Sequence, residues 1–175
     1  METLEALKKR RSIRKYKPEQ IKDDELNAII EAGLYAPTAI GRQPWKFVVL
    51  QNQEDLDALT LLNVHFRKAP ETMKPYYGAP TVIVVFGDKG DEPFYEYDCT
   101  LALGNMMNAA FDLGIGSCWI WGEKQMFETE EGRELMEKWG LSANLGGVGA
   151  IALGYPDGDF PEAAPRREGT VIIRK

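Results

Sequence analysis

Apolar positions in several stretches of the chain recur every three or four residues, which is the spacing of a helix with one buried face. The clearest case is 23–34, where Leu26, Ile29 and Gly33 fall on one side and Asp23 stands at the N-cap position. The same pattern predicts helices over residues 2–9, 54–62 and 94–113, and another that begins after Thr129 and runs to Trp139.

Four other runs are short, apolar and rich in β-branched residues, which is typical of strands. They are residues 46–50, 81–86, 117–121 and 148–153. The run TVIVVF at 81–86 predicts a strand buried on both faces. A last apolar run, TVII at 170–173, has no obvious partner strand in this chain and could pair with another subunit. Because there are no repeats and no linker, the pattern indicates one α+β domain over residues 1–175, with a mixed sheet sandwiched by helices.

The expected helix at 94–113 is apolar almost all the way round. Its apolar positions include Leu101, Leu103, Met106, Met107, Ala109, Ala110, Phe111 and Leu113. Such a helix has to be covered on every side, and large exposed apolar patches are rare on monomers. We therefore expect this helix to contribute to a subunit interface.

Residues 63–79 are expected to form a long irregular connection, since they contain Pro70, Pro75 and Gly78. Loops of this length inside a domain are often functional. The connection is therefore a candidate cover for a ligand site.

The composition is that of an ordinary globular protein, with 44% hydrophobic and 27% charged residues among 175. No apolar run approaches the ~18 residues of a membrane span, and the charged start is unlike a secretory signal. A net charge of −6 disfavours a nucleic-acid binder. We therefore expect a cytoplasmic protein without membrane or nucleic-acid partners.

Positive charge is concentrated at the two ends of this acidic chain. Basic residues near the N-terminus are Lys8, Lys9, Arg10, Arg11, Arg14, Lys15 and Lys17, and those near the C-terminus are Arg166, Arg167, Arg174 and Lys175. One interpretation is that a small anion binds where the ends meet. The alternative, which charge counts alone favour, is a pair of solvated termini.

The side-chain inventory excludes several kinds of catalytic site. Two cysteines, Cys99 and Cys118, and the single histidine, His65, cannot make a zinc site at these spacings. A serine hydrolase is disfavoured because there is no G-x-S-x-G, and neither a P-loop nor G-x-G-x-x-G is present. Both cysteines are expected to be buried, unreactive thiols. If the chain is an enzyme, a bound cofactor supplies the difficult chemistry.

Arginines at i and i+4, Arg10 and Arg14, together with Arg11 and Ser12, could surround a phosphate monoester. The alternative interpretation of this basic segment is a solvated face. Two further segments could contact a flat ligand: residues 37–45, which include Gln43, and the glycine-rich residues 114–122. Their alternative interpretations are an ordinary turn and a buried strand.

Four motifs in order along the chain resemble the FMN-dependent nitroreductase family. They are RRSIRKY, APTAIGRQPWKFVVL, AAFDLGIGSCWIWG and GAIALGYP, and the resemblance runs nearly end to end. It implies an α+β sandwich that forms an intertwined homodimer with FMN at the interface. It also implies oxidoreductase activity with NADH or NADPH as the electron donor.

The resemblance also implies a role for particular positions. Arg10, Arg11, Ser12 and Arg14 match the segment that holds the FMN phosphate and ribityl chain, and Arg166 or Arg167 matches a C-terminal basic position that completes the phosphate site. The partner's flavin contacts match Pro37, Thr38, Ala39, Gly41 and Gln43. Trp121 and Gly122 match the stretch whose backbone N–H faces flavin N5, where fixed dipoles stabilise developing charge. No side chain is assigned a catalytic role and no metal is expected.

The chain departs from the family pattern at three points. Gly41 stands where the family often has Asn, and Ala39 replaces a frequent Ser or Gly. A large insertion between the central helix and the SCWIW strand is missing, so the substrate side of the flavin is either more open or covered by residues 63–79.

The expected reaction is a ping-pong cycle in which NAD(P)H reduces FMN by hydride transfer to N5 and a small oxidised acceptor, such as a nitroaromatic or quinone, then enters the same pocket. One alternative within the fold is a specialised member such as a reductive dehalogenase. Alternatives from other classes are a flavin carrier or sensor without turnover and a phosphate-binding module without flavin.

Overall fold

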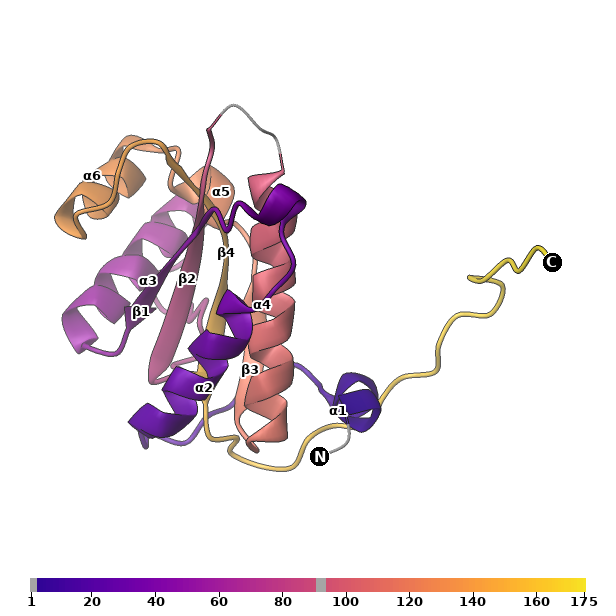
Figure 1. The fold of residues 1–175 in the computed structure, drawn as a ribbon. Helices are drawn as coiled ribbons and strands as arrows, with labels where there is room; N and C mark the ends of the chain where they lie inside the picture. The colour runs from indigo at the N-terminus through magenta and orange to yellow at the C-terminus, as the bar shows by residue number, and fades with distance from the viewer. Residues whose placement is uncertain (1–2, 91–93) are drawn as a thin grey trace.

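The computed structural model describes residues 3–90 and 94–175 as one sheet with helices on both sides (Figure 1). In chain order the elements are α1 (Thr3–Lys9), α2 (Asp23–Leu34), the 3-10 helix η1 (Ala39–Gly41), β1 (Trp45–Leu50), α3 (Gln53–Arg67), β2 (Thr81–Asp88), α4 (Tyr95–Asp112), β3 (Gly116–Ile120), α5 (Glu123–Met126), α6 (Glu130–Lys138) and β4 (Leu145–Gly154).

The four strands form an antiparallel sheet in the order β1-β2-β4-β3. The α+β class is thereby confirmed. Within the described residues, the parallel component of the expected mixed sheet is limited to an isolated bridge between Ser12 and Ser117. Central strand β2 is buried from Thr81 to Gly87, as its unbroken apolar run predicts.

Alternate residues of β2 pack into separate cores on the two faces of the sheet. Val82, Val84 and Phe86 join α3, α5 and α6 on one face. Ile83 and Val85 face the other side and pack against α2 and α4. This period of two follows from strand geometry and places helices on both faces (Figure 1).

Helix α3 runs five residues beyond its predicted end at 62, to Arg67. Leu62, Asn63 and Val64 are buried and continue its inner face, and the helix stops at Lys68, whose φ is 51°. The prediction of an irregular connection from residue 63 was therefore wrong at its start, and the connection begins at Lys68. Pro70 lies too far along to end the helix earlier.

Helix α5 has no counterpart among the sequence predictions. It is only four residues long and follows β3 directly through Trp121 and Gly122. Glycine in β4 lets α5 approach the sheet closely, because a Cβ added at Gly147 would lie 2.5 Å from the Glu123 carbonyl oxygen. The contact is tertiary, so nothing in the local pattern signals the helix.

One side of α4 is apolar and exposed in the single chain. Tyr97 is 71% exposed and Leu101 is 48% exposed, while Leu103 and Met106 on its other side are buried. This exposed side is the part of the apolar helix for which we expect a covering partner. Among the described residues, no helix is both long enough and apolar enough to cross a membrane.

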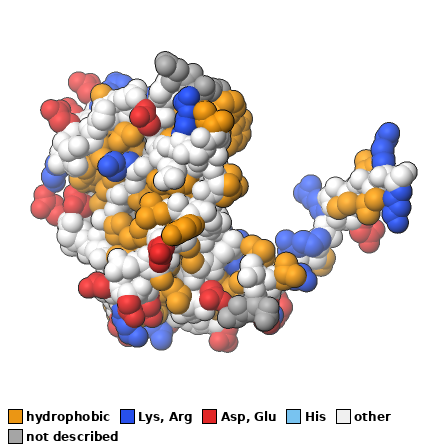
Figure 2. Space-filling view, viewed as in Figure 1, with side chains coloured by type: hydrophobic (Ala, Val, Ile, Leu, Met, Phe, Trp, Pro, Cys, Tyr) orange, Lys and Arg blue, Asp and Glu red, His pale blue; other side chains and the backbone are white. Residues whose placement is uncertain are grey.

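The chain after Pro156 leaves the sheet as an extended tail (Figure 1). Phe160 still packs edge-on against Phe111 of α4, with ring centroids 4.8 Å apart. Val171, Ile172 and Ile173 are at least 75% exposed and are in no strand of this chain. Figure 2 shows these apolar side chains at the end of the tail, clear of the rest of the molecule.

Candidate functional site

Residues 10–14 run along the edge strand β3, with Ile13 buried and Arg14 exposed. The Ile13 N–H donates to the Ser117 carbonyl oxygen at 2.9 Å, and Ser12 and Ser117 form the parallel bridge. The Ile13 side chain is 6% exposed. The strand therefore fixes the direction in which the side chains on either side of Ile13 leave the backbone.

The three arginines of this segment have different environments. Arg10 Nη1 is buried without a hydrogen-bond partner among the described residues. Arg11 turns back to its own helix, where its guanidinium donates to the carbonyl oxygens of Lys8 and Arg10. Arg14 Nε donates to the Tyr77 hydroxyl at 3.3 Å, which raises the pKa of Arg14. Arg11 Nε is likewise buried without a partner among the described residues, so Arg10 and Arg11 each have one donor left for an anion, while the other Arg11 donors cap α1.

Cys118 lies next to this basic segment on β3. Burial raises the pKa of its thiol, and the neighbouring Arg14, Ser12 and Arg10 act in the opposite direction. Burial raises the pKa of Cys99 to about 12. Both side chains are buried free thiols, as expected; their lack of reactivity stays a prediction.

The turn after β3 is held from the side by Arg67 at the end of α3. Arg67 Nη2 donates to the Trp121 carbonyl oxygen at 2.6 Å, and its guanidinium carbon lies 5.7 Å from the centre of the Trp121 ring. Gly122 has a φ of 120°, which side chains rarely allow. A hollow of about 150 Å³ opens beside the turn and is lined by Arg67, Lys74, Tyr77 and Trp121, among others.

Tyr77 connects the basic segment to the Trp121 turn. Its hydroxyl accepts from Arg14, and its ring lines the hollow beside Trp121. The structure therefore links Arg14 to the Trp121 turn through Tyr77, while Arg10, Ser12 and Arg14 lie together beside Cys118. Tyr77 itself was not named by the sequence analysis, although it lies in the connection flagged as a cover. Its place in that connection was the one available signal, because no spacing pattern distinguishes Tyr77 from its neighbours.

The Pro37–Gln43 loop lies in a different part of the molecule from the basic segment at Arg10. The Ala39 N–H donates to Oδ1 of the buried Asp98 at 3.1 Å, which ties the loop to the first turn of α4. The basic segment lies near the other end of α4, since Gly116 follows that end. With 1.5 Å per helical residue the two are roughly 20 Å apart. One chain does not bring Pro37, Thr38, Ala39, Gly41 and Gln43 to Arg10.

The backbone of this loop is strained at two residues. Ile40 and Gln43 both have positive φ values, 49° and 51°, and Ile40 is 84% exposed. The Gln43 N–H donates to the Thr38 hydroxyl at 3.3 Å. An apolar side chain is thus presented to the outside by a loop that is closed on itself.

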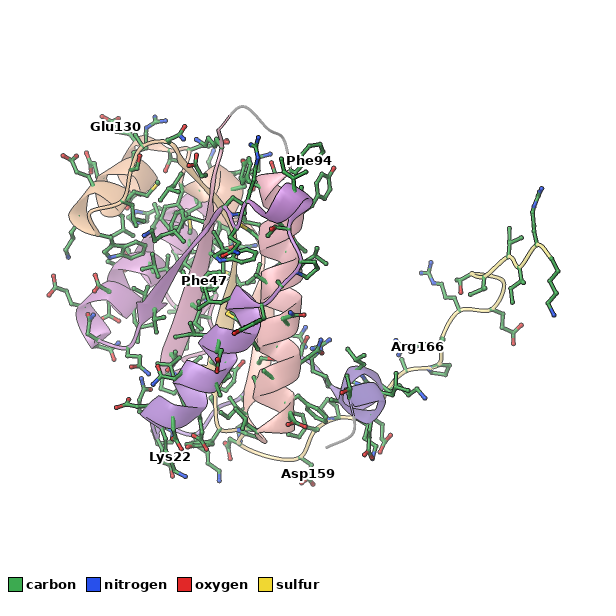
Figure 3. All side chains as sticks on the ribbon, viewed as in Figure 1. Lys22, Phe47, Phe94, Glu130, Asp159 and Arg166 are labelled. Atoms are coloured by element: carbon green, nitrogen blue, oxygen red, sulfur yellow. The ribbon has the colours of Figure 1, made fainter. Side chains whose placement is uncertain are left out.

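Among the described residues, no hydrogen bond joins Arg166 or Arg167 to Arg10. Arg166 is on the extended tail, where its guanidinium donates to the Ala164 carbonyl oxygen (Figure 3). Within one chain the tail packs through Phe160, and the residues after it are exposed, which agrees with the interpretation of solvated termini. A contribution of Arg166 or Arg167 to the phosphate site stays a prediction.

The comparisons with known proteins agree on one family. The family model described as "Nitroreductase family" matches residues 7–155. The chain belongs to the nitroreductase family.

This nitroreductase-family chain is similar to proteins from several microbes. A relative from Methanothermobacter thermautotrophicus, described as an NADH dehydrogenase/NAD(P)H nitroreductase, is 32% identical over 163 residues, which are 89% of this chain and 78% of the relative. A solved nitroreductase from Bacteroides fragilis with bound FMN is 34% identical, has a TM-score of 0.92 and is covered over 100% of both chains. A nitroreductase from Desulfovibrio desulfuricans in complex with FMN has a TM-score of 0.78 at 27% identity, with 100% of this chain and 97% of that chain covered.

In this nitroreductase-family chain, buried polar side chains lie behind the Trp121 turn. Asn63, Tyr76 and Glu123 are 0%, 4% and 0% exposed. Burial raises the pKa of Glu123 to about 7, and its Oε2 has no partner among the described residues. Sequence reasoning missed all three. Asn63 and Glu123 are polar residues on otherwise apolar faces, and the pattern gives no sign that they are buried together.

Proposed function

We propose that this chain is an FMN-dependent oxidoreductase that uses NAD(P)H and a small oxidised acceptor in a ping-pong cycle. The observation that carries the proposal is the buried, unpartnered Nη1 of Arg10 beside β3. A buried guanidinium donor without a partner is costly, and a phosphate oxygen would satisfy it. Family membership and the FMN-bound Bacteroides fragilis neighbour support FMN as the source of that phosphate.

The residues around the site fit the two ends of FMN. Arg10 and Arg14 supply cations for a phosphate with a charge of about −1.5 to −2. Ser12 lies between them and faces Cys118 across the edge of the sheet. The Trp121–Gly122 turn lies on the Tyr77 side of the site, which suits the flavin ring, and the hollow beside the turn is left for the reactants.

When bound, FMN supplies the redox chemistry, because it accepts a hydride from NAD(P)H and passes electrons to the acceptor. The chain's own contribution is to hold and orient. Arg10 and Arg14 fix the phosphate, which undergoes no reaction. The Gly122 N–H, for which the described residues provide no acceptor, is available to the ring as a fixed dipole. Nicotinamide and acceptor would use the hollow beside Trp121 in turn.

A second copy of the chain is proposed to complete the site. The exposed side of α4, the protruding loop with Ile40 and the tail with Arg166 and Arg167 all lack a surface of their own chain to cover them. In an intertwined dimer, a partner's loop and tail would reach the Arg10 segment from outside. Residues 1–175 would then act as one domain that is complete only as a pair.

The nature of the acceptor is the finer part of the proposal. Nitroaromatics and quinones fit a hollow with the aromatic rings of Tyr77 and Trp121 and the cations Arg67 and Lys74. Both cysteines are free thiols, which agrees with the reducing cytoplasm that we propose as the location.

The experiment is an absorbance spectrum of the purified protein before and after anaerobic addition of NADH or NADPH. We expect flavin bands that bleach with one of them and return when a quinone or nitroaromatic is added. A yellow protein that neither donor bleaches would be a carrier or sensor. A colourless protein that does not take up added FMN would overturn the proposal in favour of a phosphate-binding module.

A further inference from the structure

We propose that Arg67 is a positioning residue for the redox ring: it holds the Trp121–Gly122 peptide so that the Gly122 N–H points into the cofactor site, and the buried Asn63–Tyr76–Glu123 chain holds Arg67. The inference rests on the proposed function, since it concerns the same site. It goes beyond that function by naming a side chain outside the family motifs quoted above.

The first step is the geometry of one peptide unit. In a planar trans peptide the C=O and the following N–H point in opposite directions, and the described residues contain no cis peptide. The Trp121 carbonyl oxygen accepts from Arg67 Nη2 at 2.6 Å. The Gly122 N–H therefore points away from Arg67.

The second step is that the turn needs such a contact. Gly122 has a φ of 120°, and glycine samples many other backbone conformations at little cost. The short helix α5 begins directly after it, so the turn has little regular structure to fix it. Arg67 restrains it twice, through the carbonyl oxygen and through the face of the Trp121 ring, 5.7 Å from the guanidinium carbon. A fixed N–H costs no reorganisation when charge develops on the ring.

The third step is what holds Arg67. Its Nε donates to Asn63 Oδ1 at 2.7 Å, and Asn63 Nδ2 donates to the Tyr76 hydroxyl at 3.3 Å. The Tyr76 hydroxyl in turn donates to Glu123 Oε1 at 3.3 Å. Every donor points the same way, from the guanidinium to the carboxyl group, so each hydrogen bond polarises the next.

This chain of hydrogen bonds closes a loop in the structure. It starts on α3, passes through the connection before β2, ends on Glu123 at the start of α5, and so returns to the residue that follows Gly122. Asn63 and Glu123 are fully buried, which makes alternative partners from solvent unavailable. One network therefore holds the turn on both sides of Gly122, at the Trp121 carbonyl oxygen and at the Glu123 side chain.

The role requires an arginine rather than any cation. The planar guanidinium donates from Nε and Nη2 to two acceptors on different elements at once. A lysine ammonium is a single point charge on a flexible stem and cannot reproduce that fork. Arg67→Lys therefore keeps the charge and removes the positioning.

The test compares Arg67→Lys and Arg67→Gln with the parent and with Lys68→Gln, all as FMN-loaded protein. Lys68 is the matched control, because it is exposed and adjacent and has no part in the network. The readouts are the FMN dissociation constant, the two-electron midpoint potential and the single-turnover rate of reduction by NADH or NADPH. Thermal unfolding shows that each variant is folded.

We expect both Arg67 variants to keep FMN within about threefold of the parent affinity. Their preference for reduced over oxidised flavin should fall about tenfold, which is about 30 mV for a two-electron couple. The reduction rate should fall with it, and Lys68→Gln should match the parent in all three readouts.

A folded, yellow Arg67→Lys with the parent potential and reduction rate would overturn the inference while leaving the proposed function intact. The same inference also fails if Lys68→Gln shifts the potential as much as Arg67→Gln, because charge rather than position would then be the cause. If Arg67→Gln does not fold, the decision rests on Arg67→Lys alone. A parent protein that takes up no FMN would instead overturn the proposed function.

Discussion

The Arg14 Nε donates to the Tyr77 hydroxyl at 3.3 Å across 63 positions of sequence, and the guanidinium carbon lies 5.8 Å from the centre of the Tyr77 ring. This contact joins the basic segment to the connection that covers the Trp121 turn. An anion at Arg10 and a flat ring at Trp121 would therefore lie on the two sides of one tyrosine, which gives the site a phosphate end and a redox end.

The phosphate end can be tested separately from the redox end. Arg10→Ala and Arg14→Ala should each weaken FMN binding roughly ten- to a hundredfold, because a charge-assisted hydrogen bond contributes about 1.5–3 kcal/mol. The FMN that remains bound should be reduced at nearly the parent rate. Lys15→Ala is the matched control, since Lys15 pairs with Asp157 on the surface at 2.6 Å. Parent-like FMN affinity in both arginine variants would place the phosphate elsewhere.

The redox end should tolerate loss of the Trp121 side chain. The contact from Arg67 is to the main-chain oxygen, so Trp121→Ala keeps it and removes only the ring. Because Trp121 is 52% exposed and lines the hollow, we expect FMN affinity within about threefold and altered relative kcat/KM values for a quinone and a nitroaromatic. Loss of FMN from folded Trp121→Ala would contradict this assignment.

The two cysteines should be dispensable for the reaction. Cys99 and Cys118 are buried, and burial raises the pKa of both thiols. Replacing both by Ala should lower the free energy of unfolding by about 1–2 kcal/mol through lost apolar contacts. Single-turnover flavin reduction should stay within about twofold of the parent. A large loss of rate in folded, yellow protein would show that Cys118, beside Arg14, has a chemical role.

The exposed side of α4 leads to a prediction about assembly. We expect a homodimer of about 40 kDa, twice the 19.7 kDa chain, with an interface above the ~1,600 Å² of a standard contact. Leu101→Glu places a charge on the exposed apolar side and should favour the monomer, with loss of FMN. Glu134→Gln, at an exposed position on α6, is the control. Light scattering that shows a stable parent monomer with its flavin would contradict the prediction.

Local signals in the sequence are sufficient for much of the fold. The β-branched run at β2 and the apolar spacing of α2 each identify an element, because burial of that element depends on its own residues. The order of the Arg10 and Trp121 segments likewise indicates a site, although their meeting through Tyr77 requires the folded connection.

Other features depend on contacts between elements and are absent from any local pattern. Helix α5 packs on β4 because Gly147 leaves room for its backbone. Helix α3 continues to Arg67 because Val64, in its last part, is still buried. The buried Asn63 and Glu123 look like ordinary surface polar residues in sequence. Ile40 of the Pro37–Gln43 loop and the end of the tail are exposed in the single chain, and the second chain that we propose to cover them leaves no local pattern in the sequence.

Glu123 should make the free energy of unfolding fall as pH rises, whereas carboxyl groups in folded proteins usually have the opposite effect. Burial raises the pKa of this carboxyl group from 4.5 to about 7 in the folded protein. Between these values the folded protein keeps a proton that the unfolded chain has released, so the free energy of unfolding falls as pH rises. Across that window the loss is about 3 kcal/mol, at about 1.4 kcal/mol per pH unit.

Glu123→Gln removes the titration and keeps an amide oxygen to accept from Tyr76. The difference in unfolding free energy between parent and Glu123→Gln should therefore slope with pH between about 4.5 and 7, in favour of the variant at the higher pH. Urea unfolding at a series of pH values, with the same excess of FMN throughout, measures this difference and cancels the titration of other groups. Glu128→Gln, at an exposed position just after α5, should run parallel to the parent. Parallel curves for Glu123→Gln as well would mean that the carboxyl group titrates alike in the folded and unfolded chain, and is not held in the buried network.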